Sequence, residues 1–218
     1  MALLEIRDLC VNYGPIQAVR GVNMDVEEGS IVALLGANGA GKTTTLRAIM
    51  GLLPVQGGSV RLGGEEIGTT PAYRRAAQGI GYAPEDRRLV PEFTVEDNIV
   101  LPALALSLPA AERTRRLDEV YALLPQLKTM RKRPGGGVSG GQGKMVALGR
   151  ALMVARTALL LDEPFQGLAP ALALEYARTL GELRRNRPDL AILVTESTPA
   201  LLDAIADETL QIERGEIN

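Results

Sequence analysis

The chain has 218 residues, of which 46% are hydrophobic, and its 24 basic and 26 acidic side chains leave a formal net charge of -2. This length and composition suffice for one large folded core and exclude a chain that is mostly disordered. Without an excess of positive charge, nothing favours a nucleic-acid backbone as the main ligand. The chain contains no histidine, which removes the commonest general base and the commonest metal ligand from the candidates.

The N-terminus and the apolar stretches predict a protein that is soluble by itself. Residues 1–5 do not begin a basic region followed by a long apolar segment, so we expect no secretory signal. The longest apolar stretch, residues 147–161, is interrupted by Arg150 and Arg156 and is shorter than the roughly 20 residues of a membrane span. The single Cys10 excludes an internal disulfide and fits a reducing compartment.

The first part of the chain predicts an antiparallel sheet. Residues 3–9 and 22–26 alternate apolar with polar side chains, and residues 59–67 do so around Gly63 and Gly64, which is a hairpin signal. We expect these strands to flank the element that lies between them in the sequence.

That element is a glycine-rich loop, residues 36–44, between a buried strand at 31–35 and a helix at 44–50. It fits the phosphate-binding pattern G-x-x-x-x-G-K-[ST], in which glycines let backbone N–H groups point at phosphate oxygens. Lys42 would hold the outer phosphates, and the Thr43 hydroxyl would hold Mg2+. A turn without a ligand is the alternative, but it needs neither lysine nor threonine. The candidate phosphate-binding residues here, which the family resemblance described below assigns to ATP, are Gly36, Asn38, Gly39, Ala40, Gly41, Lys42, Thr43 and Thr44.

The middle of the chain changes to a helical pattern. A short strand at 80–83 runs into Pro84 and Glu85, and helices are predicted at 94–106, capped by Thr94 and Asp97, and at 110–124. Pro134 and the glycines at 135–137 predict a flexible joint.

A second phosphate-binding helix end follows this joint. Ser139 and Gln142 have the spacing of a capping box before the apolar-periodic run at 145–154, and Gly140 and Gly141 leave the helix amides open to a phosphate. One chain could bind two anions, but the more economical interpretation is that this helix end faces the nucleotide of a second subunit.

Two carboxylates end the next strand. Residues 158–161 are apolar and are followed by Asp162 and Glu163. Because the carboxyl ends of parallel strands face the ligand crevice, both acids would lie beside the phosphate loop. Asp162 would then hold Mg2+ through water, and Glu163 would polarise the attacking water, unless the two acids merely cap the strand.

The rest of the chain predicts a helix at 171–185, a strand at 191–195, a short helix at 200–206 and a last strand at 208–212. Strands that alternate with helices in this way predict an α/β fold with a mostly parallel sheet covered on both faces.

Taken together, the loop at 36–44, the Ser-Gly-Gly-Gln run at 139–142, the Leu-Leu-Leu-Asp-Glu-Pro run at 159–164 and their order resemble the ATP-binding subunit of an ABC transporter over nearly the whole chain. The resemblance implies one ABC ATPase domain, 1–218. It has a P-loop NTPase core at 1–84 and 156–218, with an N-terminal antiparallel β subdomain, and an inserted helical subdomain at 85–155 that ends in the signature helix.

The resemblance also implies a site shared between subunits. Two such subunits pair head to tail, so that each ATP lies between the phosphate loop of one and the signature residues of the other, here Ser139, Gly140, Gly141 and Gln142. ATP hydrolysis would drive transmembrane permease subunits and would place this chain at the cytoplasmic face of the inner membrane, without nucleic acid as a partner.

Further positions carry over from the family pattern one by one. Tyr13 matches the aromatic residue that stacks on adenine, worth about 1 kcal/mol, although it could be only a strand-end aromatic. Glu85 stands where a glutamine usually contacts Mg2+ and the attacking water. Ala169 replaces an aspartate, and Gly143 is expected to break the start of the signature helix at about 1 kcal/mol.

Glu196 is the largest departure, because the family typically has a switch histidine there. An ionised carboxylate cannot donate a hydrogen bond and is repelled by phosphate. We therefore expect Glu196 to point elsewhere or the site to work more slowly, with Ser197 or Thr195 as a weaker donor.

Four segments, residues 84–88, 94–98, 149–153 and 167–170, resemble one of the two ATP-binding subunits of bacterial branched-chain amino-acid importers, or of urea and short-amide importers. That subunit commonly lacks the switch histidine, whereas Asp86 and the Phe165-Gln166 pair depart from its pattern. Two alternatives stay open: a catalytically weak structural subunit that completes the partner's ATP site, and an ABC ATPase that exports or acts without a membrane partner.

Overall fold

The computed structural model describes residues 2–217, which form two sheets with one helix packed between them. The first sheet is antiparallel in the order β2-β1-β4-β5. Its strands are β1 (Ala2–Tyr13), β2 (Ile16–Glu27), β4 (Gly57–Leu62) and β5 (Glu65–Glu66). This arrangement confirms the predicted antiparallel sheet and the hairpin at Gly63 and Gly64, which both have positive φ.

The second sheet has the order β10-β9-β3-β8-β7-β6 and is parallel except at β10. Its strands are β3 (Ile31–Leu35), β6 (Ile80–Ala83), β7 (Ala158–Asp162), β8 (Ala191–Glu196), β9 (Glu208–Glu213) and β10 (Glu216–Ile217). The central strands are buried on both faces, because alternate residues enter different cores. In β3, for example, Ile31 and Ala33 join one core, whereas Val32 and Leu34 join the other.

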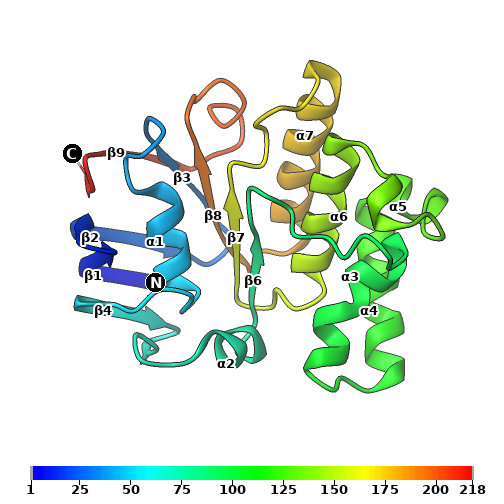
Figure 1. Ribbon diagram of the computed structural model, residues 1–218, viewed down its shortest axis with the longest axis horizontal. Helices are drawn as coiled ribbons and strands as arrows, with labels where there is room; N and C mark the ends of the chain where they lie inside the picture. Colours follow the sequence, from blue (N-terminus) through cyan, green and yellow to red (C-terminus); the bar gives the residue numbers. More distant parts are fainter. Residues whose placement is uncertain (1, 218) are drawn as a thin grey trace.

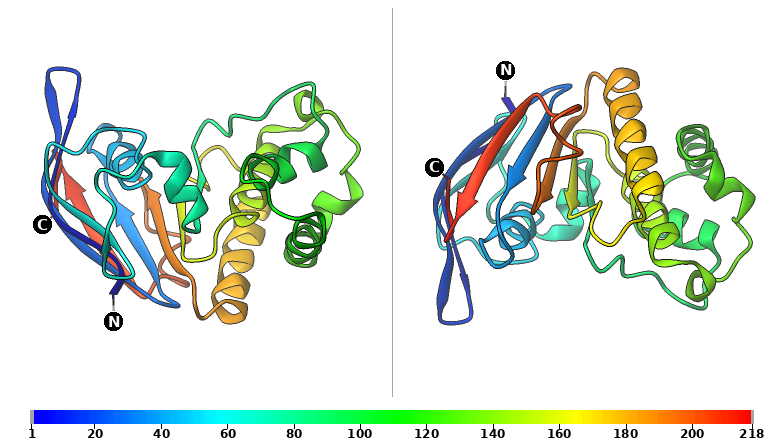
Figure 2. Two further views of the ribbon diagram at one scale, coloured as in Figure 1. Left: turned by 90° about the horizontal axis from the view of Figure 1, so that it is seen from below. Right: turned by 90° about the horizontal axis from the view of Figure 1, so that it is seen from above.

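Helices cover both faces of this parallel sheet (Figures 1 and 2). Helix α1 (Lys42–Ile49) lies between the parallel strands and the antiparallel sheet. Helices α6 (Gly140–Leu152) and α7 (Pro170–Asn186) cover the opposite face. Helices α3 (Val95–Ala105), α4 (Ala110–Leu123) and α5 (Pro125–Thr129) pack beyond α6, and α2 (Ala72–Ala77) lies before β6.

The register of the parallel strands brings the candidate residues to one edge. Leu35 pairs with Glu196 at the ends of β3 and β8, and Asp162 pairs with Thr195 at the ends of β7 and β8. The segments that follow these strands therefore begin side by side. As a result, the phosphate loop, Glu163 and Ser197 leave the sheet at a common edge.

Two local predictions are wrong for physical reasons. Residues 200–206 form isolated turns rather than a helix, because their N–H groups bond back to only two carbonyls, those of Pro199 and Leu202, and no continuous ladder of bonds forms. Gly143 does not break α6, which begins at Gly140 and continues through it. A Cβ at Gly143 would lie 3.0 Å from Arg87 Cδ, so the absent side chain lets the loop before α3 approach the helix.

The glycines at 135–137 do not form the predicted flexible joint. They form a 3-10 turn, η1 (Gly135–Gly137), in which the Gly135 N–H donates to the Phe93 carbonyl at 2.7 Å. A Cβ at Gly135 would lie 2.7 Å from the Val90 carbonyl oxygen. The glycine therefore permits close packing of two backbone segments. The sequence analysis also did not anticipate α2, α5 and β10.

Arg75 is a buried cation that ties α2 to the end of α1. Its side chain is 1% exposed and donates to the carbonyls of Ala48, Ile49, Gly68 and Thr70 over 2.7 to 2.8 Å. We predict that Arg75→Leu lowers the free energy of unfolding by about 3 kcal/mol, because four carbonyl acceptors lose their donor, two of them in buried hydrogen bonds. Urea denaturation measures this loss.

Arg74→Ala is the matched control, since the Arg74 guanidinium lies over the exposed ring of Tyr73 with 5.9 Å to its centroid. This control is expected to change the free energy of unfolding by less than about 1 kcal/mol. Equal losses in the two variants would contradict the structural role assigned to Arg75.

Candidate functional site

The loop between β3 and α1 adopts a conformation that requires its glycines. Gly39 and Gly41 have φ values of +83° and +117°. A Cβ at Gly36 would lie 2.4 Å from the Ile212 carbonyl oxygen, and one at Gly41 would lie 2.8 Å from the Ala18 carbonyl oxygen. Side chains at these positions would push the loop away from β9 and β2 and away from the N-terminus of α1.

Lys42, the first residue of α1, is 3% exposed and points back into this loop. Its Nζ donates to the carbonyls of Gly36 at 2.6 Å and Ala37 at 3.1 Å, and it forms an ion pair with Glu163 Oε1 at 3.0 Å. The ammonium group thus lies inside the loop with an anionic partner from the end of β7. This is the position from which it can bind an anionic ligand held by the loop.

Asp162 is 2% exposed and accepts three side-chain hydrogen bonds. The donors are the hydroxyls of Thr43 at 2.9 Å, Thr195 at 3.0 Å and Tyr82 at 3.2 Å. Burial raises the pKa of Asp162, and the three hydroxyl bonds oppose this effect. The Thr43 and Asp162 oxygens lie together beside the loop, and oxygen atoms of this kind suit a hard divalent cation such as Mg2+.

Glu163 has an unusual backbone that directs its side chain to Lys42. Its φ is +45°, in the left-handed region. Its N–H donates to the Thr195 carbonyl at 3.1 Å, while its own carbonyl accepts from Lys144 Nζ of α6. The carboxylate is 5% exposed, and these backbone contacts hold it at the loop.

A crevice of about 340 Å³ unites most of these groups. Its lining combines β2, the phosphate loop and the segments that follow β6 and β7: Ala18, Asn38, Gly39, Gly41, Lys42, Thr43, Thr44, Glu85, Glu163 and Gln166. The structure thus brings the predicted residues Glu85 and Glu163 to the loop. Tyr13 does not line this crevice and is 59% exposed at the turn between β1 and β2.

The segment that begins at Glu85 is attached to α6. Arg150 of α6 donates to the carbonyls of Arg87 and Arg88, and Arg87 Nη1 donates to the Gly140 carbonyl at 3.3 Å. Burial lowers the pKa of the Arg150 guanidinium. These bonds attach the segment after Glu85 to the first and the last turn of α6.

Ser139 and Gln142 form the predicted capping box at the N-terminus of α6. The Ser139 hydroxyl accepts from the Gln142 N–H at 3.2 Å, and Gln142 Oε1 accepts from the Ser139 N–H at 3.0 Å. Ser139 and Gly140 are exposed, and none of the residues 139–142 lines the crevice at the phosphate loop. The local geometry is confirmed, and the role of this helix end toward another subunit stays a prediction.

Glu196 is buried at the end of β8 and contacts the segment after β7. Its Oε1 accepts from the Phe165 N–H at 2.7 Å, and its Oε2 accepts from the Ser197 N–H at 3.4 Å. Burial raises the pKa of Glu196 and Glu163 raises it further, whereas the two backbone bonds and Lys144 lower it. The carboxylate therefore does not lie where a phosphate would receive a hydrogen bond from it.

The raised pKa makes Glu196 a pH-dependent element of stability. Because the folded protein favours the protonated acid, its contribution is fully present below the unfolded pKa of about 4.5 and is lost as pH rises through the folded pKa. We predict that Glu196→Gln unfolds at a higher temperature than the wild type at pH 8. This difference should disappear toward pH 4, as measured by thermal melts across that range. A difference that grows as pH falls would contradict the prediction.

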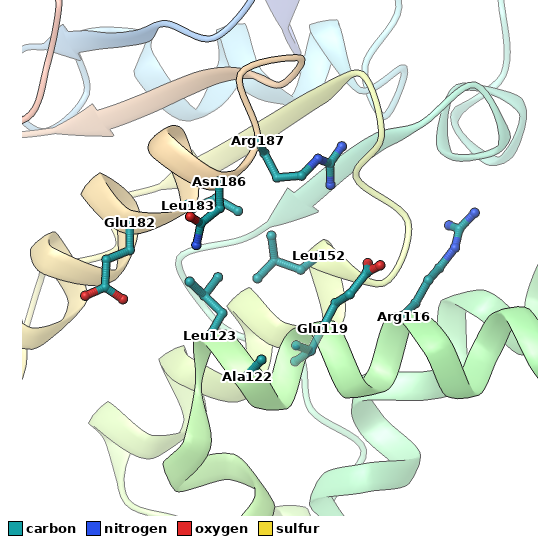
Figure 3. A pocket seen from close by; sticks show the side chains of 10 residues that line it. Arg116, Glu119, Ala122, Leu123, Leu152, Glu182, Leu183, Asn186 and Arg187 are labelled. Atoms are coloured by element: carbon teal, nitrogen blue, oxygen red, sulfur yellow. The ribbon is translucent and has the colours of Figure 1, made fainter.

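A second cavity, of about 360 Å³, lies between α4 and α7 (Figure 3). Leu123 and Leu152 lie between Glu119 of α4 and Glu182 of α7 in this view. The guanidinium groups at its rim are already paired, because Arg116 binds Glu112 at 2.6 Å and Arg187 binds Asp189 at 2.9 Å. No phosphate-loop residue lines it, so the phosphate-binding chemistry belongs to the first crevice.

Sequence reasoning missed several contacts of the site. Tyr82, Lys144, Arg150 and Gln166 were not singled out, although Tyr82 ends the strand at 80–83 and Gln166 follows Glu163 closely. Lys144 lies about one turn into α6 and Arg150 lies in its last turn, where a helical pattern alone does not show what lies opposite. Among the described helices, none has both the length and the apolar character that a membrane crossing requires.

A loop that wraps a lysine between a parallel strand and a helix, with an acidic pair at the end of a second parallel strand one position further along the sheet, defines an α/β P-loop NTPase. The family model described as ABC transporter matches residues 19–166. The chain belongs to the ABC transporter family, as an ATP-binding subunit that hydrolyses ATP. ABC ATPases use Mg2+ with ATP, and such subunits work with transmembrane permease components.

Similar proteins cover nearly the full length of the chain. The high-affinity branched-chain amino acid transport ATP-binding protein BraG of Pseudomonas aeruginosa is 35% identical over 99% of this chain and 91% of its own length. The lipopolysaccharide export system ATP-binding protein LptB of Escherichia coli K12 is 31% identical over 100% of this chain and 89% of its own length.

Among solved structures, an ATP-binding subunit of an ABC transporter superposes with a TM-score of 0.85 at 28% identity, covering 99% of this chain and 88% of that one. An ATP-binding cassette of an ABC transporter superposes with a TM-score of 0.87 at 26% identity, covering 100% and 90%. These likenesses confirm the predicted fold class and family.

Proposed function

We propose that the crevice at residues 36–44 binds Mg-ATP and that Glu163 activates the water that attacks its terminal phosphate. The observation that carries this proposal is the pairing of Lys42 with Glu163 at 3.0 Å and of Thr43 with Asp162 at 2.9 Å within one site. Lys42 would exchange Glu163 for phosphate oxygens, which frees the carboxylate to accept a proton from water.

The donor set also fits the cation that accompanies ATP. The Thr43 hydroxyl and the Asp162 carboxylate would hold Mg2+, with Glu85 across the crevice. When bound, the ion neutralises charge on the phosphates. Tyr13, exposed at the turn between β1 and β2, would stack on the adenine ring.

The exposed start of α6 supports a site shared with a second ATP-binding subunit. Ser139, Gly140, Gly141 and Gln142 would contact the ATP of the partner, which would in turn cover the phosphate loop of this chain. Residues 85–155 would act as the helical subdomain and residues 1–84 and 156–218 as the core. Arg150 and Arg87 would link the two through the segment after Glu85.

The transporter that this subunit powers is proposed to be a bacterial importer of branched-chain amino acids, at the cytoplasmic face of the inner membrane. The match to BraG over 99% of the chain favours this assignment. The match to LptB, over 100% of the chain, favours an exporter as the second candidate.

Uptake in the source cell separates the two candidates. Deletion of the chain should abolish uptake of labelled leucine, isoleucine and valine, and the wild-type chain should restore it whereas Lys42→Ala should not. Uptake that survives deletion, together with loss of an exported lipid from the cell surface, would select the exporter.

A further inference from the structure

The end of β8 presents two neighbouring polar side chains in different directions. Glu196 is 5% exposed and both of its carboxylate oxygens accept backbone N–H groups, from Phe165 at 2.7 Å and from Ser197 at 3.4 Å. The Phe165 ring in turn meets Tyr176 edge-on, with 5.6 Å between centroids and 79° between the planes. Glu196 therefore holds the segment after β7 against α7.

Ser197 is exposed, and its hydroxyl lies among the groups of the phosphate loop. It contacts Lys42 Nζ at 3.4 Å, Asn38 Oδ1 at 3.0 Å and Glu163 Oε1 at 3.4 Å. Asn38 belongs to the loop, and Lys42 and Glu163 are the pair that an arriving phosphate would separate. The hydroxyl thus lies at the end of the loop where the terminal phosphate must enter.

Glu196 and Ser197 also differ in whether they can donate a hydrogen bond to a phosphate. An ionised carboxylate only accepts hydrogen bonds, and it repels phosphate oxygens. A hydroxyl can donate to a phosphate oxygen while it accepts from an ammonium group. Ser197 therefore can bridge Lys42 and a phosphate, which Glu196 cannot do.

We propose that Ser197 supplies the hydrogen-bond donor to the terminal phosphate of ATP in this chain, and that Glu196 is a positioning residue which fixes the Phe165 backbone. This inference rests on the proposed binding of ATP at the loop. In this proposal Ser197 contacts the phosphate, and Glu196, the residue before it, positions the segment that follows Glu163.

A second contact supports the positioning role of Glu196. Lys144 of α6 donates to the Glu163 carbonyl, and its charge interacts with that of Glu196. The segment from Glu163 to Phe165 is thus held by Lys144 at the Glu163 carbonyl and by Glu196 at the Phe165 N–H. Lys144 lies on α6, whose N-cap residue is Ser139. Its bond to Glu163 therefore connects the segment after β7 to the signature helix of the same subunit.

The affinities for ADP and for the β,γ-imido analogue of ATP, both with Mg2+, test the proposal in the full-length protein. A donor to the terminal phosphate matters for the analogue and not for ADP. Ser197→Ala should weaken analogue binding about tenfold and change ADP binding less than about twofold, whereas Ser197→Thr should retain the wild-type ratio. Ser59→Ala, on β4, is the matched control and should change neither affinity.

Glu196 variants complete the test. Glu196→Ala should lower kcat for ATP while leaving the ratio of the two affinities as in the wild type. Glu196→Gln should recover much of that kcat, because its amide oxygen still accepts from the Phe165 N–H. An unchanged ratio in Ser197→Ala, or an altered ratio in Glu196→Gln, would overturn the inference. Failure of the wild type to bind the analogue would instead overturn the proposed function.

Discussion

Glu163→Gln should bind Mg-ATP and hardly hydrolyse it. The amide cannot accept the proton of the attacking water, and general-base catalysis typically contributes a factor of at least about 100 in kcat. Binding should persist, because the amide also frees Lys42 from the ion pair that now holds it at 3.0 Å. The measurement is phosphate release beside ATP affinity, both in the presence of the partner subunits.

The control for this variant is Glu175→Gln, a carboxylate on the exposed side of α7. It removes the same charge outside the crevice and should turn over ATP at the wild-type rate. If Glu163→Gln hydrolyses ATP as fast as this control, the role assigned to Glu163 is wrong.

Lys42→Ala should lose most of the affinity for Mg-ATP. The lysine is 3% exposed and lies inside the loop, where a charge-assisted hydrogen bond to phosphate is lost with no water to replace it. We expect a loss of about 100-fold, equivalent to about 3 kcal/mol. Calorimetric titration with the imido analogue measures it without hydrolysis.

Lys128→Ala, at an exposed position of α5, removes a lysine far from the crevice lining and should bind the analogue with wild-type affinity. Nucleotide binding that is equal in the two lysine variants would show that ATP does not occupy this loop.

Much of the core could be predicted from the sequence because its signals are local. The phosphate-loop pattern is contained in residues 36–44, and the structure places β3 before it and α1 at its end as expected. Capping boxes at Thr94 and at Ser139 depend on residues only three positions apart, and both are formed.

The remaining features depend on contacts between distant segments. Glu196 points to the Phe165 N–H and not to the phosphate site, because a segment 31 residues away in the sequence packs beside it. Gly143 was assigned a cost in helix propensity, whereas its absent side chain makes room for Arg87. A single sequence does not show that Phe165 lies beside Glu196 or that Arg87 packs against Gly143. The roles of Glu196 and Gly143 therefore follow only from the fold.

The roles of Lys42 and Ser139 in the assembled transporter test the central claim most directly. ATP turnover is measured for the complex of this chain with its partner subunits, with Lys42→Ala or Ser139→Ala introduced in this chain alone. If the chain hydrolyses ATP at its own loop, Lys42→Ala should lower turnover strongly. Wild-type turnover in Lys42→Ala, combined with its loss in Ser139→Ala, would contradict this and would show that the chain only completes the partner's site.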